Sequence, residues 1–442
     1  MSHVFHRNPK QNMPTAVKGE GIYLIDGNGK RYLDASGGAA VSCLGHEHPR
    51  IIQAIKKQAD MLEYAHTSFF TTPAAEELAD FLVERAPTGL ERVYFLSGGS
   101  EAIEASLKLA RQYFVEIGQP QRKYFIARRQ SYHGNTLGAL AIGGNAARRE
   151  PFLPILIPAH YVSPCYAYRG QNPNATEEQY ADRLAAELES KILELGADQV
   201  AAFIAETVVG ATLGAVPPVR TYFQKIRTVC DKYGVLLILD EVMSGMGRTG
   251  RLFACAEDGI SPDLLAIAKG LGAGYQPIGA MLVSQKMYEA VLNGSGAFQH
   301  GHTYIGHVMA CAAALEVQRT IEEENLLENV RARGEQLRSL LSQVFVNHPH
   351  VGNIRGRGLL VGVELVRDRA SKKPFDPKDK INAQIKMEAM QRGLLVYPGG
   401  GTADGKSGDH VLLAPPFICN SHDIEKVVDL LASTLDAVLG GM

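Results

Sequence analysis

Two ionisable side chains directly follow short apolar runs in the middle of the chain. Asp240 ends the run 235–239, and Lys269 follows the run 264–268. A carboxylate there can pair with a protonated ring nitrogen, and a partly buried amine with a lowered pKa can act as a nucleophile. The interval between them has room for one strand–helix–strand crossover, so we expect both side chains at one edge of a sheet. The alternatives are an acidic strand end or a magnesium ligand for Asp240, and a solvated lysine for Lys269.

A glycine-rich turn is a candidate phosphate site. The sequence Ser97-Gly98-Gly99-Ser100 follows the apolar run 92–96 and precedes a helical pattern. Glycines let backbone amides approach an anion closely, and the start of a helix adds free N–H groups and a favourable dipole. We therefore expect a phosphate on Gly99 and Ser100. A tight turn with an N-cap serine would leave the same pattern.

Three further side chains could hold a flat ring. Tyr132, in the segment SYHGNT after the run 123–127, could stack on one face of the ring, and Val242 could pack on it as well. His133 is a candidate binding residue, although a structural role for its imidazole stays open. A phosphate cradle, a stacking ring, a carboxylate and an amine are the groups that a pyridoxal 5′-phosphate site needs. The combination, rather than any one motif, predicts that cofactor.

The elements that must position these residues alternate between apolar strands and amphipathic helices. Strands are expected at 92–96, 123–127, 200–205, 235–239, 264–268 and 280–283. Helices are expected between them, for example at 100–116 and 221–233. Such alternation is typical of an α/β domain with a mainly parallel sheet, whose ligands collect at the carboxyl ends of the strands.

The rest of the chain predicts a second, smaller α+β domain. We expect an N-terminal segment of this small domain at 1–70, the large cofactor-binding domain at 71–310, and the C-terminal part of the small domain at 311–442. Within that last part, a strand is expected at 394–397. The segment 398–408 is expected to be a long flexible loop or a cluster of turns because it is rich in glycine.

The composition excludes several classes of protein. Lys and Arg number 45 against 47 Asp and Glu, so a formal charge of −2 gives no electrostatic reason to bind nucleic acid or an anionic membrane. No apolar run reaches the ~20 residues of a membrane span, and the N-terminus does not look like a signal peptide. The six cysteines form no CxxC pair and no metal-like spacing, so no metal site is expected. A reduced, cytoplasmic protein is the simplest interpretation.

Nearly the whole chain resembles the class III, or omega-type, aminotransferases, which have the aspartate-aminotransferase-like fold type I. The motifs that carry the resemblance are GKRYLDASGG, GHEHPRI, SGGSEAIEASLKLAR, SYHGNT, AAFIAETVVGATLGAVPP, LLILDEVMSGMGRTG, AIAKGLGAGYQPIGA, GHTYIGHVMACAAALE and LLAPPFI. It implies ping-pong transfer of an amino group from an amine or omega-amino acid to a 2-oxo acid, pyruvate or 2-oxoglutarate. A lyase, an aminomutase or a decarboxylase on the same scaffold is the alternative.

The resemblance also implies roles for individual residues. Lys269 is similar to the lysine that forms the Schiff base and moves the substrate proton, and Asp240 to the partner of the pyridine nitrogen. Glu206 resembles a glutamate near the reactive face of the cofactor. Thr303, in GHTY, resembles a residue that reaches the phosphate of the neighbouring subunit, which implies a homodimer, or a tetramer, with shared sites. Candidates for the substrate pocket are Tyr64, Ser68, Phe69 and His302.

Three positions depart from arginines that members of this family use to bind a substrate carboxylate. Asn135 follows the HG pair, Leu413 precedes APP, and Gly405 lies shortly before a GDH triplet with Lys406 beside it. A lysine does not reproduce the bidentate geometry of an arginine. The usual carboxylate clamps are therefore altered. Asn135 favours pyruvate as the acceptor and a donor without a glutamate-like distal carboxylate.

Overall fold

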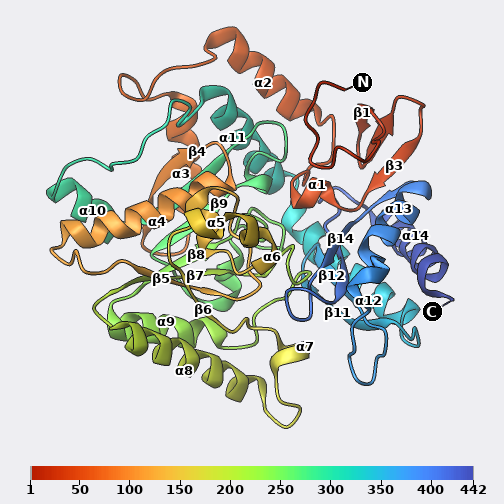
Figure 1. The fold of residues 1–442 in the computed structure, drawn as a ribbon. Helices are drawn as coiled ribbons and strands as arrows, with labels where there is room; N and C mark the ends of the chain where they lie inside the picture. Colours follow the sequence, from red (N-terminus) through yellow and green to blue (C-terminus); the bar gives the residue numbers. More distant parts are fainter. Residues whose placement is uncertain (1, 442) are drawn as a thin grey trace.

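A seven-stranded sheet forms the centre of the larger part of the structure (Figure 1). The computed structural model describes residues 2–441. In spatial order the strands are β4 (Leu90–Leu96), β10 (Gly279–Ser284), β9 (Leu264–Ile267), β8 (Leu236–Asp240), β7 (Val200–Glu206), β5 (Tyr124–Arg128) and β6 (His160–Val162). Strands β9, β8, β7, β5 and β6 are parallel, whereas β10 is antiparallel to its neighbours β4 and β9. The predicted α/β class and mainly parallel sheet are confirmed.

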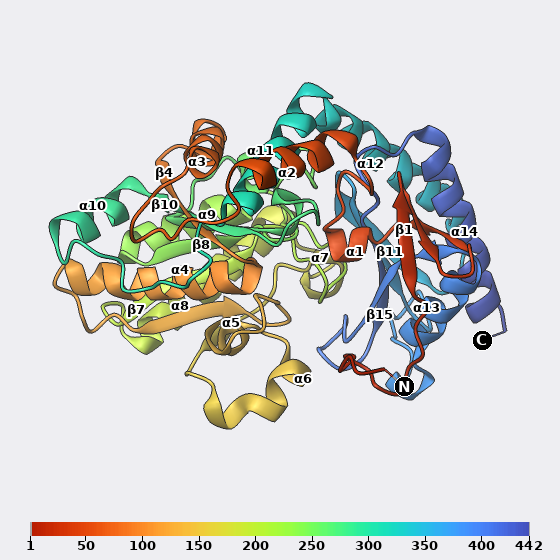
Figure 2. The same cartoon turned by 90° about the horizontal axis from the view of Figure 1, so that it is seen from above.

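Helices cover both faces of this sheet (Figure 2). One face packs against α4 (Gly99–Glu116), α5 (Leu137–Ile142) and α10 (Gln285–Asn293). The other face packs against α3 (Pro73–Arg85), α8 (Glu177–Leu195), α9 (Tyr222–Tyr233) and α11 (Val308–Glu323). Because the strands are buried on both sides, their sequences are almost continuously apolar. No helix within residues 2–441 is both long enough and apolar enough to cross a membrane.

The smaller part combines both ends of the chain around two four-stranded sheets. The first contains β1 (Ala16–Glu20), β2 (Tyr23–Asp26), β3 (Arg31–Asp34) and β13 (Leu394–Leu395). The second contains β11 (Val351–Arg357), β12 (Leu360–Leu365), β15 (Asp409–Leu413) and β14 (Tyr397–Gly400). Their core also receives side chains from α2 (Pro49–Met61), α12 (Leu326–Val344), α13 (Ile381–Gln391) and α14 (Ser421–Leu439). Helix α11 contributes buried side chains to both cores, so the boundaries at 70 and 310 stay predictions.

The expected strand at 394–397 and loop at 398–408 need correction. The chain changes sheets within the first segment, because β13 pairs with β3 whereas β14 begins at Tyr397 and pairs with β15. Residues 398–400 are therefore strand rather than loop. A side chain at Gly399 would collide with the His410 ring on β15, so glycine is required by close packing and does not signal a turn here.

Candidate active site

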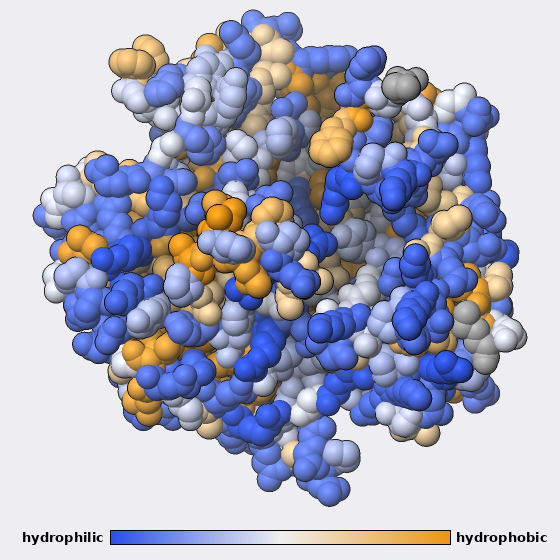
Figure 3. All heavy atoms as spheres, viewed as in Figure 1, coloured by the Kyte–Doolittle hydropathy of each residue, from blue (hydrophilic) through white to orange (hydrophobic). Residues whose placement is uncertain are grey.

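The carboxyl ends of β4, β5, β7, β8 and β9 surround a cavity of about 450 Å³. The face drawn in Figure 3 is hollowed between the larger and smaller parts of the molecule. Lys269, Asp240, Glu206, Tyr132, His133, Val242, Gly99 and Ser100 all line this cavity. The structure thus brings together every predicted site residue except Thr303.

Asp240 is the last residue of β8, and only 5% of it is exposed. The His133 Nδ1–H donates a hydrogen bond to one carboxylate oxygen at 2.8 Å, and the Val242 backbone N–H donates to the other at 3.0 Å. The adjacent Glu241 is held away from the cavity by the N–H groups of Ala254 and Cys255, each at 2.7 Å. Asp240 is therefore the oriented carboxylate of this strand end.

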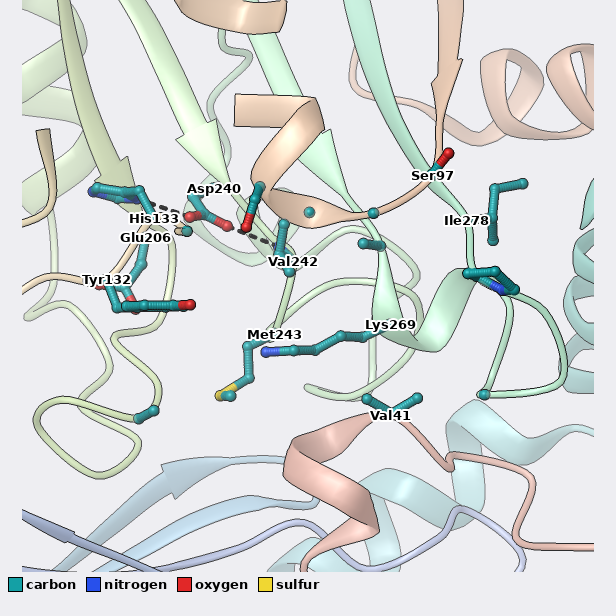
Figure 4. Close-up of a pocket in the computed structure, with 18 of the residues that line it drawn as sticks. Val41, Ser97, Tyr132, His133, Glu206, Asp240, Val242, Met243, Lys269 and Ile278 are labelled. Atoms are coloured by element: carbon teal, nitrogen blue, oxygen red, sulfur yellow. Dashed lines mark hydrogen bonds and ion pairs between the residues drawn. The ribbon is translucent and has the colours of Figure 1, made fainter. Parts of the chain in front are cut away.

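Lys269 begins the short helix η3 (Lys269–Leu271), and only Ala268 separates this helix from β9. Its backbone has φ +46°, a left-handed conformation that costs a non-glycine residue about 1–2 kcal/mol and often occurs at functional sites. In Figure 4 its side chain extends across the cavity toward Tyr132. Burial lowers the pKa of the amine to about 8, although the carboxylates of Asp240 and Glu206 oppose that shift. The amine is thus poised to lose its proton near neutral pH.

One end of the cavity lies at the start of α4, where Gly98, Gly99 and Ser100 line it. Gly98 caps this helix without a side-chain hydrogen bond, so the N-cap serine alternative is wrong. A Cβ atom at Gly99 would lie 2.6 Å from Val242 Cγ1, and one at Gly134 would lie 2.7 Å from Ser100 Oγ. Only glycine therefore fits at these two positions. A helix start with no side-chain cap offers its N–H groups to an anion.

Glu206 ends β7 and joins two loops at the cavity. Its carboxylate accepts hydrogen bonds from the N–H of Tyr132 at 3.3 Å and of Gly210 at 3.1 Å. Only 6% of the residue is exposed, and burial raises the pKa of the carboxyl group. The Arg128 guanidinium donates a hydrogen bond to the Glu206 carbonyl oxygen. Glu206 therefore fixes the loop that carries the ring of Tyr132.

Thr303 and the expected pocket residues lie elsewhere on the subunit. Thr303 is exposed, and its carbonyl oxygen accepts a hydrogen bond from the Tyr64 hydroxyl at 2.7 Å. None of the four residues Tyr64, Ser68, Phe69 and His302 lines the cavity of its own chain. Phe69 is 79% exposed, and the neighbouring Phe70 is 67% exposed. These residues can complete a site only if they reach another subunit.

The three altered carboxylate positions supply no positive charge. Asn135 is exposed, and its backbone N–H donates to Ser100 Oγ at 3.1 Å. Leu413 is fully buried in the core of the smaller part. Gly405 lies in a turn with φ +90°, a conformation that would strain an arginine.

Several residues that line the cavity were not predicted from the sequence. Val41, Val208, Ala211 and Met243 contribute apolar surface from loops on both parts of the molecule. Their small apolar side chains have no local pattern that distinguishes them from core residues. Only the position of Met243 three residues after Asp240 offered a clue.

The donor set fits pyridoxal phosphate. An uncapped helix start faces one end of the cavity, an oriented carboxylate lies at its base, and a half-buried amine crosses it. Tyr132 and Val242 provide the flat and apolar surfaces that a ring needs. Glycine at positions 99 and 134 lets the backbone pack closely against Val242 and Ser100, which line the same end of the cavity.

Comparisons with known proteins agree with this geometry. The sequence pattern of the family "Aminotransferase class-III" matches residues 5–435. An uncharacterized aminotransferase of Schizosaccharomyces pombe is 44% identical over 100% of this chain and 96% of its own length. A probable mitochondrial gamma-aminobutyrate transaminase of Oryza sativa subsp. indica is 37% identical over 95% of this chain and 81% of its own. The omega transaminase of Pseudomonas jessenii, solved in complex with PMP, superposes with a TM-score of 0.92 at 36% identity, covering 99% of this chain and 97% of that one. The chain therefore belongs to the class III aminotransferases, which use pyridoxal 5′-phosphate as their cofactor.

Proposed function

We propose that the enzyme moves the amino group of an amine or omega-amino acid to a 2-oxo acid, with Lys269 and Asp240 as its catalytic residues. The observation that carries this proposal is that both side chains line one cavity, although a full crossover separates them in the sequence. The name of the rice relative supports an omega-amino acid as donor. The reaction is proposed to have two half-reactions of ping-pong type, because one lysine amine must be displaced by the donor and restored after the acceptor has reacted.

Asp240 holds a proton at the pyridine nitrogen in this proposal. When bound, pyridoxal phosphate supplies an aldehyde carbon that joins an amine and a ring that accepts the electrons released at the substrate carbon. An ionised Asp240 keeps the ring nitrogen positively charged and so strengthens the electron sink. The hydrogen bonds from His133 and Val242 orient the carboxylate before substrate arrives.

Lys269 moves the substrate proton. Its amine has a pKa of about 8, so an appreciable fraction is neutral under physiological conditions. With the cofactor bound, the neutral amine of Lys269 would take up the proton from the substrate carbon that bears nitrogen and hold it for return on the same face of the site. Tyr132 and Val242 confine the ring, while Gly99, Ser100 and the α4 start bind the phosphate. Glu206 holds the Tyr132 loop in place.

Pyruvate is the proposed acceptor. Asn135 provides no charge for the distal carboxylate of 2-oxoglutarate, and Leu413 lies in the apolar core. A dicarboxylic acceptor would bury its second charge without a partner, at a cost of several kcal/mol. A monocarboxylic acceptor has no second carboxylate, so it needs a cationic partner for only one group.

Borohydride trapping together with a substrate screen tests the proposal. Reduction of the cofactor-loaded protein should fix the cofactor onto Lys269, as identified by peptide mass spectrometry. Donor amines with pyruvate should yield alanine, faster than glutamate forms from 2-oxoglutarate. Lys269→Ala should lose both trapping and turnover, and full activity in this variant would reject the proposal. Release of carbon dioxide or ammonia without a new amino acid would instead indicate a decarboxylase or a lyase.

We also propose a homodimer with shared sites. Thr303 is exposed and outside its own cavity, which supports a role toward the phosphate bound by a second copy of the chain. The exposed Phe69 and Phe70 supply apolar surface of the kind that an interface buries. Sedimentation of the loaded protein should give twice the chain mass of 47.9 kDa, or four times for a tetramer.

The compartment is proposed to be the cytoplasm. All six cysteines are unpaired and buried, which suits a reducing environment. Fractionation of the native host followed by immunodetection tests this assignment, and recovery only in an organelle would contradict it.

A further inference from the structure

The cavity contains a cation for the cofactor but none for a substrate carboxylate. Among the described residues that line it, Lys269 is the only lysine or arginine. A 2-oxo acid and an amino acid each carry a carboxylate, which needs a charged partner once it leaves water. Since positions 135, 405 and 413 provide no cation, that partner must come from another element.

Arg148 brings a guanidinium group to the side of this cavity. Its guanidinium carbon lies 4.8 Å from the centre of the Tyr132 ring, and Tyr132 lines the cavity. Arg148 is exposed and belongs to α6 (Ala146–Arg149). Within residues 2–441 its side chain forms neither an ion pair nor a hydrogen bond. All five guanidinium N–H groups are thus available to a ligand.

Hydrogen bonds hold α6 against the loop that carries Tyr132. The Gln130 N–H donates to the Gly144 carbonyl oxygen at 3.0 Å, and the Gly144 N–H donates to Ser131 Oγ at 3.0 Å. The Asn145 side chain then caps α6 by accepting from the Arg148 N–H at 3.2 Å. In Figures 1 and 2 α6 lies beside the boundary between the two parts of the molecule. These hydrogen bonds fix the position of the Arg148 backbone relative to the loop that carries Tyr132.

We propose that Arg148 binds the carboxylate shared by the 2-oxo acid and the amino acid, an inference that rests on the proposed aminotransferase function. A guanidinium stacked on an aromatic ring keeps its N–H edge free, and that edge matches a carboxylate bidentately. The Tyr132 ring thus serves the cofactor site and also supports the arginine. This arrangement replaces the missing family arginines with one from a different segment.

Lys406 is the rival cation. The loop that contains Lys406 is hydrogen-bonded to the segment that precedes Tyr132. Gln130 Nε2 donates to the carbonyl oxygens of Gly401 and Thr402, each at 3.1 Å. However, Lys406 is exposed, and within residues 2–441 no hydrogen bond, ion pair or cation–π contact joins its side chain to a residue that lines the cavity. Lysine also offers a point charge instead of a planar fork. The geometry therefore favours Arg148.

Arg149 offers a matched control on the same helix. Its guanidinium carbon lies 4.9 Å from the centre of the Tyr161 ring, and Tyr161 does not line the cavity. We would compare cofactor-loaded wild type with Arg148→Ala, Arg148→Lys, Arg149→Ala and Lys406→Ala. The substrates are pyruvate and propanal, which lacks the carboxylate. Calorimetric binding of propanoate to the loaded enzyme gives a second readout that needs no turnover.

Arg148→Ala should raise the KM for pyruvate and the Kd for propanoate by about tenfold to a hundredfold. The KM for propanal and borohydride trapping on Lys269 should stay within about twofold of wild type. Arg148→Lys should recover part of the loss, and Arg149→Ala should match wild type.

Two results would overturn the inference. One is that Arg148→Ala leaves the KM for pyruvate and the Kd for propanoate unchanged. This result would be most decisive if Lys406→Ala raised both constants. The other is an equal loss for propanal and pyruvate, which would mean that Arg148 only supports the loop. Failure of the proposed function looks different, because wild type would then bind propanoate and trap its cofactor but form no amino acid from any oxo acid.

Discussion

His133 Nδ1 lies 2.8 Å from a carboxylate oxygen of Asp240, and the other ring nitrogen of His133 is buried without a hydrogen-bond partner within residues 2–441. A carboxylate can only accept a hydrogen bond, so the imidazole must carry its proton on Nδ1. The histidine thus contacts the carboxylate and orients it for the ring nitrogen. This relationship makes His133 a positioning residue.

Replacing His133 or Asp240 should weaken the electron sink of the cofactor ring, and the loss should be larger for Asp240. His133→Phe keeps an aromatic ring but removes the donor, and kcat should fall about tenfold to a hundredfold. Asp240→Asn removes the charge, and kcat should fall by about a hundredfold to a thousandfold. Steady-state kinetics with the best donor and pyruvate provide the measurement.

A second substitution at position 133 separates loss of the hydrogen-bond donor from a purely structural effect. Asn at position 133 retains an N–H donor, so His133→Asn should recover part of the activity that His133→Phe loses. The pH dependence of the bound-cofactor absorbance should shift in His133→Phe and return toward wild type in His133→Asn. Equal loss in both variants would argue against orientation of Asp240.

The reactivity of Lys269 should depend on pH with a midpoint near 8. Burial lowers the pKa of its amine to about 8, so the reactive neutral form increases as the pH rises through that value. In cofactor-free protein, uptake of pyridoxal phosphate onto Lys269 should therefore be slow at pH 6 and fast at pH 9. Stopped-flow absorbance followed by peptide mapping gives the profile.

Exposed lysines on the same protein are the internal control for this experiment. Lys56 and Lys57 lie on the outer side of α2, outside the cavity. Their labelling should increase only toward the ordinary lysine pKa near 10.4. A midpoint for Lys269 in that range would show that burial does not lower its pKa.

The convergence of Asp240 and Lys269 could be predicted because it depends on rules that act locally. Asp240 ends one short apolar strand and Lys269 follows another, and the carboxyl ends of parallel strands meet at one edge of a sheet. The direction of β10 could not be predicted, since its sequence fits either orientation between β4 and β9. Its insertion there depends on packing across the whole sheet.

Residues that join the site from other elements have no comparable signal. Val41 follows a short N-terminal helix and lines the cavity only because the two parts of the molecule pack together. Arg148 looks like any charged residue on a polar helix, and its contact with Tyr132 depends on how α6 folds back. The strand at 398–400 could not be predicted because its glycines are more typical of a loop. The positions of Val41, Arg148 and this strand all depend on contacts between segments that are distant in the sequence.

Adding one methyl group at Gly99 should weaken cofactor binding. Alanine normally stabilises a helix by up to about 1 kcal/mol relative to glycine. Here the new Cβ would lie 2.6 Å from Val242 Cγ1, so Val242 or the helix start must move. The Kd of pyridoxal phosphate should rise by about tenfold or more in Gly99→Ala. Gly99→Ala/Val242→Ala should regain part of the affinity, whereas no recovery would mean that the clash lies elsewhere.

A buried charge cluster should control the attachment of the smaller part to the larger one. Glu364 on β12 accepts hydrogen bonds from Arg169 Nε at 2.6 Å and Arg355 Nη1 at 2.5 Å, and the Tyr166 hydroxyl also donates to it. Arg169 belongs to α7 (Ala167–Gly170) in the larger part, whereas Arg355 and Glu364 belong to the smaller sheet. Glu364→Gln would leave without a counter-charge two guanidinium groups whose side chains are only 16% and 8% exposed.

Removal of that charge should reduce stability by roughly 3–5 kcal/mol. Urea denaturation of the loaded protein, followed by tyrosine fluorescence, provides the measurement. Glu335→Gln, on the exposed side of α12, is the control and should change the midpoint little. A Glu364→Gln midpoint equal to that of the control would show that the cluster does not hold the two parts together.

Subunit mixing should test whether Thr303 completes the site of its partner. Thr303→Ala homodimers should bind pyridoxal phosphate more weakly, because a hydroxyl donor to the phosphate is lost. Lys269→Ala homodimers should have no turnover. If Thr303 acts across the interface, a mixed dimer contains one site with wild-type Lys269 and wild-type Thr303.

The mixed population should therefore regain activity at cofactor concentrations too low for the Thr303→Ala homodimer. With random exchange about half of the dimers are mixed, and each carries one intact site, so activity should approach a quarter of the wild-type value per chain. If Thr303 acted within its own chain, every site in the mixture would lack one of the two residues, and mixing would restore nothing. Because Thr303 lies outside the cavity of its own chain, we expect recovery.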